Sequence, residues 1–417
     1  MHTKTRHSLR TGFLKFLYII TPLLCIYAGE TTKLSFLFEL KTAGQEDSSL
    51  LNSLIMSLSL VGVPAIGLFS DKNCRKKTLM CLVLFEIAAL FLLEHSQFVA
   101  SALQGLIGAA VVAVSRAAYL DVRPVVTNII SRNSVRIPAQ DDSLLAGIAV
   151  VETVIVQAAA WTFHSFFTEL DLVLISKVLF ACLIILLVFF NDLRDWESET
   201  SDHEIKSARK EYLSGYAWQL LVAFFLYDCA FQTPNYFSEA YYDTSKLSTE
   251  IDVVGGGIFA GCFAVWVVLL SIYYFRSIRH LITRKEKMMY RIRKGVFFSS
   301  LALFVVFLFP FAKYRSLFHS KIEFIDLFIF TFIGGIVLAL IFVYFTNRVK
   351  PHERGFLYGI LEEVETLAEA ISPVFVYTFL PAGALTNIPF LILIGSGLLC
   401  IRKFKDKKNM VNKLLVK

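Results

Sequence analysis

Charged residues are scarce in this sequence, and the shortage limits what the chain can be. Asp, Glu, Lys and Arg make up only 18% of its 417 residues, whereas soluble proteins contain about 25%. Hydrophobic residues make up 56%, so too few polar side chains remain to cover the surface of a soluble protein. This composition excludes an ordinary soluble domain and indicates a chain that lies largely within a membrane.

Motifs for several kinds of chemistry are also missing. The sequence has no G-x-x-x-x-G-K-[ST] motif, which excludes a P-loop nucleotide site, and no H-E-x-x-H motif for a zinc protease. The seven cysteines include no C-x-x-C pair, a pattern typical of small buried side chains rather than of disulfides or a zinc site. We therefore expect no enzyme activity, no cofactor and no bound metal.

Long apolar segments are what the sequence has instead. Twelve of them approach the roughly 20 residues that a helix needs to cross the hydrocarbon core of a bilayer. The sequence therefore predicts an all-α membrane protein with twelve transmembrane helices. The segments are residues 13–30, 49–69, 78–94, 98–118, 143–166, 172–190, 214–233, 253–275, 295–312, 323–346, 356–380 and 385–401.

Positive charge is distributed unevenly between these segments. If the N-terminus is cytoplasmic, 33 of the 41 Lys and Arg residues fall on the cytoplasmic side of the membrane and 6 fall on the other side. Such a bias follows the positive-inside rule and predicts that both termini are cytoplasmic. It also accounts for the net charge of +7, so we expect no nucleic acid partner.

The longest polar stretch inside the chain divides it into two halves of nearly equal length. This stretch, residues 191–213, is predicted to be a cytoplasmic linker between two six-helix bundles, 13–190 and 214–402. Residues 1–12 and 403–417 are then a short N-terminal segment and a basic tail, both cytoplasmic.

A basic turn between the second and third apolar segments carries a recognisable pattern. Gly67, Asp71 and the basic residues Lys72 and Arg75 resemble the signature loop between helices 2 and 3 of the major facilitator superfamily. Cys74 stands where the superfamily usually has a second glycine.

A second stretch supports this resemblance. Pro351, Gly355 and Gly359 are similar to the Pro-x-x-x-Gly-x-x-x-Gly pattern before helix 11 of many members. The fourth segment contains Gln104 but has Ser101 where the superfamily has Arg, and the fifth lacks the Gly-Pro-rich motif of drug antiporters, which argues against a drug exporter. The resemblance implies two six-helix bundles that rock about a solute site at the membrane midplane.

The resemblance also implies a cytoplasmic gate around the basic turn. The carboxylate of Asp71 would accept hydrogen bonds at the positive N-terminus of helix 11, and Arg116 and Asp121 would extend the charge cluster from the fourth segment. The alternative is that the basic residues only set the topology. The expected gate residues are Gly67, Asp71, Arg75, Arg116, Asp121, Arg354 and Gly355.

Acidic residues inside the apolar segments are the candidates for binding a solute or a proton. A charge in hydrocarbon costs at least ~2.5–3.5 kcal/mol, so it usually faces a cavity or a partner. Glu362 and Glu369 share one face of the eleventh segment with two glycines, and such a face should meet protein or water. Glu86 and Lys177 lie on segments that are peripheral in the superfamily, and we expect them to be structural. The candidates are Glu30, Glu152, Asp228, Glu362 and Glu369.

These observations predict a secondary active transporter that moves a small polar metabolite by alternating access. Protons are the expected coupling ion, because acids outnumber bases within the segments. An exporter or an uncoupled facilitator of the same fold is an alternative, as is a non-transporting receptor or accessory membrane protein. The expected partners are a small-molecule solute, protons and the lipid bilayer, for a monomeric protein of a bacterial inner membrane.

Overall fold

The computed structural model of the chain is built from helices. Within the residues that it describes, the chain forms twelve helices and no strand. No water competes for backbone groups inside a bilayer, so long apolar segments satisfy their own N–H and C=O groups by forming helices. The prediction of an all-α protein is confirmed. The described residues are 12–42, 45–93, 95–131, 142–162, 169–190, 216–241, 247–279, 285–308, 321–349, 353–379 and 388–402.

The helices follow the order of the predicted segments. Stretches within α3, α5, α6, α7, α10 and α12 are each long and apolar enough to cross a bilayer. The twelve helices are α2 (Gly12–Thr42), α3 (Gln45–Lys72), α4 (Arg75–Leu92), α5 (Gln97–Ser131), α6 (Asp142–Thr162), α7 (Glu169–Phe189), α9 (Tyr216–Tyr241), α10 (Leu247–Arg279), α11 (Lys285–Leu308), α12 (Lys321–Thr346), α13 (Arg354–Phe379) and α14 (Ile388–Arg402).

Many of the helices are longer than the apolar segments that predicted them, and α2 and α5 exceed theirs by the most. α2 continues to Thr42 and α5 to Ser131, although the apolar runs end near residues 30 and 118. Glu30 therefore lies inside a helix, where it is buried, rather than at its end. The apolar pattern stops at the first charged residues, but the helices continue because those charges face other helices and not lipid.

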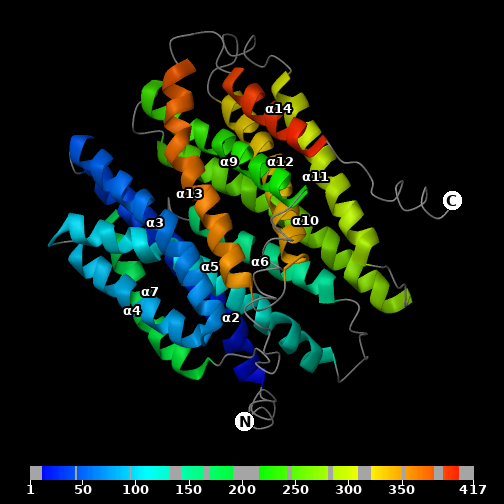
Figure 1. Ribbon diagram of the computed structural model, residues 1–417, viewed down its shortest axis with the longest axis horizontal. Helices are drawn as coiled ribbons and strands as arrows, with labels where there is room; N and C mark the ends of the chain where they lie inside the picture. The colour runs from blue at the N-terminus through cyan, green and yellow to red at the C-terminus, as the bar shows by residue number, and fades with distance from the viewer. Residues whose placement is uncertain are drawn as a thin grey trace.

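The helices form two bundles with the same internal pairing (Figure 1). α2 to α7 make the first bundle and α9 to α14 the second. In the first, α5 packs against α2, α3 and α4, and in the second α12 packs in the same way against α9, α10 and α11. α7 packs against α2 and α4, as α14 packs against α9 and α11. This repeated pairing is the pseudo-repeat of two six-helix bundles.

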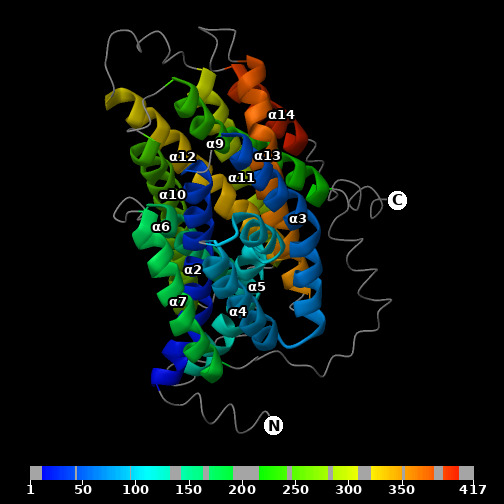
Figure 2. The same cartoon turned by 90° about the vertical axis from the view of Figure 1, so that its left-hand side faces the viewer.

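The bundles meet along two helix pairs, α3 with α13 and α6 with α10. The pseudo-repeat relates the two pairs, because α3 corresponds to α10 and α6 to α13. Figures 1 and 2 show α13 beside α3 in two perpendicular views. α13 also contacts α5, and α12 contacts α6, so α13 packs against two helices of the first bundle, α3 and α5.

Glycines bring paired helices into close contact within each bundle. A Cβ atom added at Gly105 of α5 would lie 2.7 Å from the carbonyl oxygen of Ile55 of α3. In the second bundle, a Cβ atom added at Gly335 of α12 would lie 2.5 Å from the carbonyl oxygen of Ile258 of α10. Small residues allow this close approach of backbones in membrane proteins.

Replacing Gly105 by alanine should therefore destabilise the fold. The new methyl group meets backbone atoms of α3, which cannot turn aside as a side chain can, so we expect a loss of about 1–3 kcal/mol and a lower midpoint of thermal unfolding in detergent. Gly256→Ala is the matched control, because its added Cβ would have Thr162 Cγ2, at 4.0 Å, as its neighbour. An unchanged midpoint for Gly105→Ala would contradict the close packing of α3 and α5.

Candidate functional site

A charged network joins the two bundles at the end where α3 turns into α4. Asp71, at the end of α3, accepts hydrogen bonds from the backbone N–H groups of Gly355 (2.9 Å) and Phe356 (2.7 Å), the second and third residues of α13. These N–H groups have no partner within their own helix, and the helix dipole makes this terminus positive. One carboxylate of the first bundle thereby caps a helix of the second.

Two arginines and a second carboxylate complete this gate network, which we define as Asp71, Arg75, Asp121, Arg354 and the start of α13. Arg75 pairs with Asp71 (Nη2 to Oδ1, 3.1 Å) and with Asp121 (Nε to Oδ2, 2.8 Å). Arg354 pairs with Asp121 (3.0 Å) and donates to the carbonyl oxygen of Leu120 (3.0 Å). Two acids thus alternate with two arginines in a buried, charge-balanced chain across both bundles.

Gly67 and Gly355 allow α3 and α13 to meet at the gate network. A Cβ atom added at Gly67 would overlap with the carbonyl oxygen of Gly355, and one at Gly355 would lie 2.6 Å from the carbonyl oxygen of Gly67. The structure therefore brings together six of the seven residues that the resemblance assigns to the gate.

Arg116, the seventh, lies in a different cluster from the one expected. It precedes Asp121 on α5 by roughly 7.5 Å along the helix axis and is fully buried. Its guanidinium forms an ion pair with Glu362 of α13 and donates to Gln157 of α6, and it lies 4.9 Å from the ring centroid of Phe342 of α12. The apolar run ends at residue 118 and so suggested that Arg116 was near the end of its helix, but α5 continues to Ser131.

Glu30 of α2 continues the cluster around Arg116. It accepts hydrogen bonds from Gln157 Nε2 (2.8 Å) and Trp161 Nε1 (3.0 Å) of α6. Glu362, Arg116, Gln157, Glu30 and Trp161 thus form one connected set, which we call the central network. It links α13 of the second bundle with α5, α6 and α2 of the first.

Sequence reasoning missed Gln157, Trp161 and Lys33 in this region. Gln157 and Trp161 lie four residues apart on α6, and this spacing on one helix face is the signal that could have found them. Lys33 was assigned to an outer loop because the apolar run ends before it. In the structure it lies one turn beyond Glu30 on α2, with its amine 5.9 Å from the ring centroid of Trp161.

Glu152 is held in a separate ion pair. Both of its carboxylate oxygens accept from Arg123 at 2.9 Å, and it also accepts from the Tyr119 hydroxyl at 2.5 Å and from Trp266 Nε1 of α10 at 3.3 Å. Arg123, one of the Lys and Arg residues counted on the cytoplasmic side, lies on α5 with 22% of its side chain exposed. Because Trp266 belongs to the second bundle, Glu152 links the two bundles. It is not among the residues that line the cavity described below, and its predicted role in binding a solute or a proton remains a prediction.

Replacing Arg123 by glutamine should break its ion pair with Glu152, which joins α5 and α6 within the first bundle. The carboxylate of Glu152 would keep only neutral donors, and we expect a loss of about 1–2 kcal/mol in the free energy of unfolding. The double variant Arg123→Gln/Glu152→Gln should recover part of that loss, since it leaves no unpaired charge. Thermal unfolding of the two single variants and the double variant measures the coupling, and strictly additive effects would contradict the bridge.

The two remaining acidic candidates are not among the residues found in this cluster. Asp228 is buried on α9, a helix that packs against α13 and α14. Glu369 belongs to α13, but its side chain lies outside the described part of the structure. Their predicted roles remain predictions.

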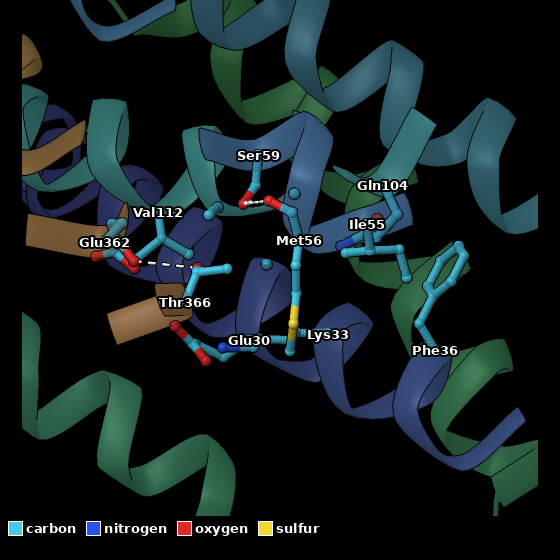
Figure 3. A pocket seen from close by; sticks show the side chains of 13 residues that line it. Glu30, Lys33, Phe36, Ile55, Met56, Ser59, Gln104, Val112, Glu362 and Thr366 are labelled. Carbon is cyan, nitrogen blue, oxygen red and sulfur yellow. Dashed lines mark hydrogen bonds between the residues drawn. The ribbon is translucent and has the colours of Figure 1, made fainter. Parts of the chain in front are cut away.

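A cavity lies between α2, α3, α5 and α13 (Figure 3). It encloses about 650 Å³ of empty space, including its open mouth. Its polar wall consists of Glu30, Lys33, Gln104, Glu362 and Thr366, together with Ser59, and most of the other lining residues are apolar. A concave wall that is mostly apolar and carries a few polar groups is typical of a small-molecule site.

The order of residues along α5 fixes where this cavity lies. Its lining includes Gln104 and Val112, which precede Arg116, and Arg116 in turn precedes Asp121 of the gate network. The pair of Arg116 and Glu362 therefore lies at the end of the cavity nearest the gate network, with Glu362 as part of the cavity wall. The protein is closed at the gate end, and the cavity lies on the other side of the closure.

Two pseudo-repeated six-helix bundles, with a polar cavity near their interface and a charged network that joins them at one end, are the architecture of many secondary transporters. The family model of the Major Facilitator Superfamily matches residues 17–373, and the chain belongs to that superfamily. It is accordingly a transporter and not an enzyme. A search of curated proteins found no match to this chain in sequence.

Solved structures of similar fold include the human organic anion transporter MFSD10, with a TM-score of 0.66 and 14% identity over 93% of this chain and 98% of the other. The Escherichia coli fucose:proton symporter has a TM-score of 0.60 and 14% identity over 93% and 99%. A bacterial homologue of the iron transporter ferroportin, in an outward-facing state, has a TM-score of 0.56 and 12% identity over 93% and 96%. At these identities the likeness establishes the fold alone.

Proposed function

We propose that the protein is a proton-coupled symporter of a small polar solute, and the ion pair of Arg116 and Glu362 carries this proposal. The two side chains are 0% and 5% exposed, they join the bundles, and they lie directly beneath the cavity. The bundles must part here during alternating access, and separating a buried ion pair is costly because each partner is left with an uncompensated charge. Protonation of Glu362 removes one of the two charges and lowers that cost.

The proposed cycle uses this pair as a switch. With the gate network closed, solute and proton enter the cavity from its open side, and the proton binds to Glu362. Arg116 then keeps Gln157 as its partner, and the bundles part at the gate end. Release of solute and proton on that side restores the pair. Glu362 is thus the proton carrier, and the gate network alternates between closed and open.

We assign the gate end to the cytoplasm, with both chain termini on that side, in keeping with the distribution of Lys and Arg. The conformation is then outward-facing. The proposed location is a bacterial inner membrane, and the proposed functional unit is a monomer, because each chain has its own cavity and gate.

Two of the similar structures support parts of this proposal. One is a fucose:proton symporter, so the fold is compatible with proton coupling. Another is in an outward-facing state, the state assigned here. The third is an organic anion transporter, and since the three proteins differ in what they carry, the solute is not inferred from them.

The alternatives are an exporter, an uncoupled facilitator in which the ion pair is only a mechanical lock, and a relative that no longer transports. The test is internal acidification of proteoliposomes that contain the purified protein and a trapped pH-sensitive dye. Pools of amino acids, amines, sugars, nucleosides and organic acids are added outside. Acidification with one pool is the expected result. If no pool causes internal acidification, in protein shown to be folded, the proposal of symport is overturned.

A further inference from the structure

The charges around the cavity do not balance. The carboxylates of Glu30, Glu362, Glu363 and Glu365 lie within electrostatic reach of two cations, Arg116 and Lys33. Four acids against two bases leave a difference of two negative charges. In a membrane-buried cluster such an excess is unfavourable, so further positive charge should enter when the site fills. One coupling proton supplies half of it.

Two buried oxygen atoms also lack a hydrogen-bond donor among the described residues, one on Gln104 in the cavity wall and one on Glu363, which bonds to the lining residue Ser59. Gln104 lines the cavity and is only 5% exposed, and its Oε1 has no partner there. Glu363 is 7% exposed; its Oε2 accepts from Ser59 at 3.4 Å, but its Oε1 has no partner in the described structure. Buried acceptors are nearly always satisfied, so these two indicate a ligand that brings N–H or O–H donors.

Lys33 shows where a cation fits. In Figure 3 the side chains of Glu30, Lys33 and Glu362 gather toward one end of the cavity, and Gln104 lies toward the other. The ammonium of Lys33 interacts electrostatically with Glu362 and Glu363. The Lys33 side chain extends from α2 one turn beyond Glu30. It therefore places a covalently attached cation at the acidic end of the cavity.

We propose that the transported solute carries a protonated amine, which replaces the ammonium of Lys33 among the carboxylates of Glu30 and Glu362, and a second donor that reaches Gln104 Oε1. This inference rests on the proposed transport function. One solute ammonium and one proton together neutralise the excess of two negative charges. Ile55, Met56 and Val112 line the wall between the two ends and favour a short apolar spacer in the solute.

Two classes of solute carry such an ammonium group: amines without a carboxylate, and amino acids. A variant of Lys33 distinguishes the two classes. If Lys33 is only a competitor for the acidic end, removing it should tighten binding of either class. If Lys33 instead binds the carboxylate of an amino acid, its removal should abolish binding of amino acids.

The test is ligand-dependent thermal stabilisation of the purified full-length protein, which requires no transport. Short amino alcohols, amino acids, sugars and dicarboxylates are titrated separately. We expect an amine-bearing class to raise the unfolding midpoint, and Lys33→Met to lower its Kd about tenfold. Lys177→Met is the control, because Lys177 of α7 lies over Phe91 at 4.8 Å and is not among the cavity-lining residues; its Kd should match the wild type.

Several outcomes would overturn the inference. Stabilisation by sugars or dicarboxylates alone, or by none of the classes at millimolar concentration, would exclude an amine-bearing solute. Loss of amino acid binding in Lys33→Met would exclude displacement of Lys33. Amine binding without proton influx would instead overturn the symport proposal and leave the solute class standing, so the two failures are distinguishable.

Discussion

Replacing Glu362 by glutamine is expected to abolish solute-driven proton uptake, with an initial rate at least about 100-fold below wild type, equivalent to about 2.7 kcal/mol. Glutamine keeps the shape of the side chain and can still accept a hydrogen bond from Arg116. It cannot bind and release a proton, however, so the proposed switch has no carrier. Solute exchange across the membrane at equal pH should persist, since exchange does not require net proton movement.

Glu86→Gln is the control for this experiment. It replaces another buried acid, which lies on α4 and is not among the residues that line the cavity, so coupled uptake should be retained. Glu362→Asp, which keeps the carboxylate, should recover part of the activity. Full proton uptake by Glu362→Gln would show that another group carries the proton.

Replacing Asp71 by asparagine should open the gate end and slow transport by roughly 10- to 100-fold. The change removes the charge from two hydrogen bonds to the start of α13 and from the pair with Arg75. Hydrogen bonds to a charged group contribute about 1.5–3 kcal/mol each. Losing even one such contribution shifts the equilibrium between the closed and open gate by about tenfold or more.

Hydrogen–deuterium exchange detects this shift directly. Peptides that contain the start of α13 should exchange faster in Asp71→Asn, because the N–H groups of Gly355 and Phe356 lose their acceptor. Lys72→Gln is the control: it removes a charge from the adjacent, exposed position without touching the network. Equal protection of these peptides in Asp71→Asn and wild type would contradict the role given to Asp71.

The gate could be read from the sequence because it depends on local spacing. Gly67 and Asp71 lie one helical turn apart, so their positions relative to α13 follow from a short motif. The structure places both against Gly355, where the resemblance had put them. The number of helices and their division into two bundles followed in the same way from the lengths of the apolar runs.

The central network was harder to predict, because a hydropathy profile does not show whether a charged residue at the edge of an apolar run faces lipid or another helix. The apolar runs that contain Glu30 and Arg116 stop near those residues, and the pattern suggested that the helices stopped as well. The partnership of Arg116 with Glu362 spans 246 residues of sequence, and no periodicity within one helix reveals it. Gln157 is uncharged, so it was not among the ionisable residues selected in the apolar segments, although it links Arg116 to Glu30.

Accumulation of solute inside proteoliposomes tests most directly whether a proton gradient drives solute through this cavity. Proteoliposomes with a neutral interior are placed in acidic medium with labelled solute of the class found by binding. The proposed mechanism predicts that internal solute rises above the external concentration and falls back when a protonophore collapses the gradient. Equilibration to the external concentration, with or without the gradient, would contradict it and identify an uncoupled carrier.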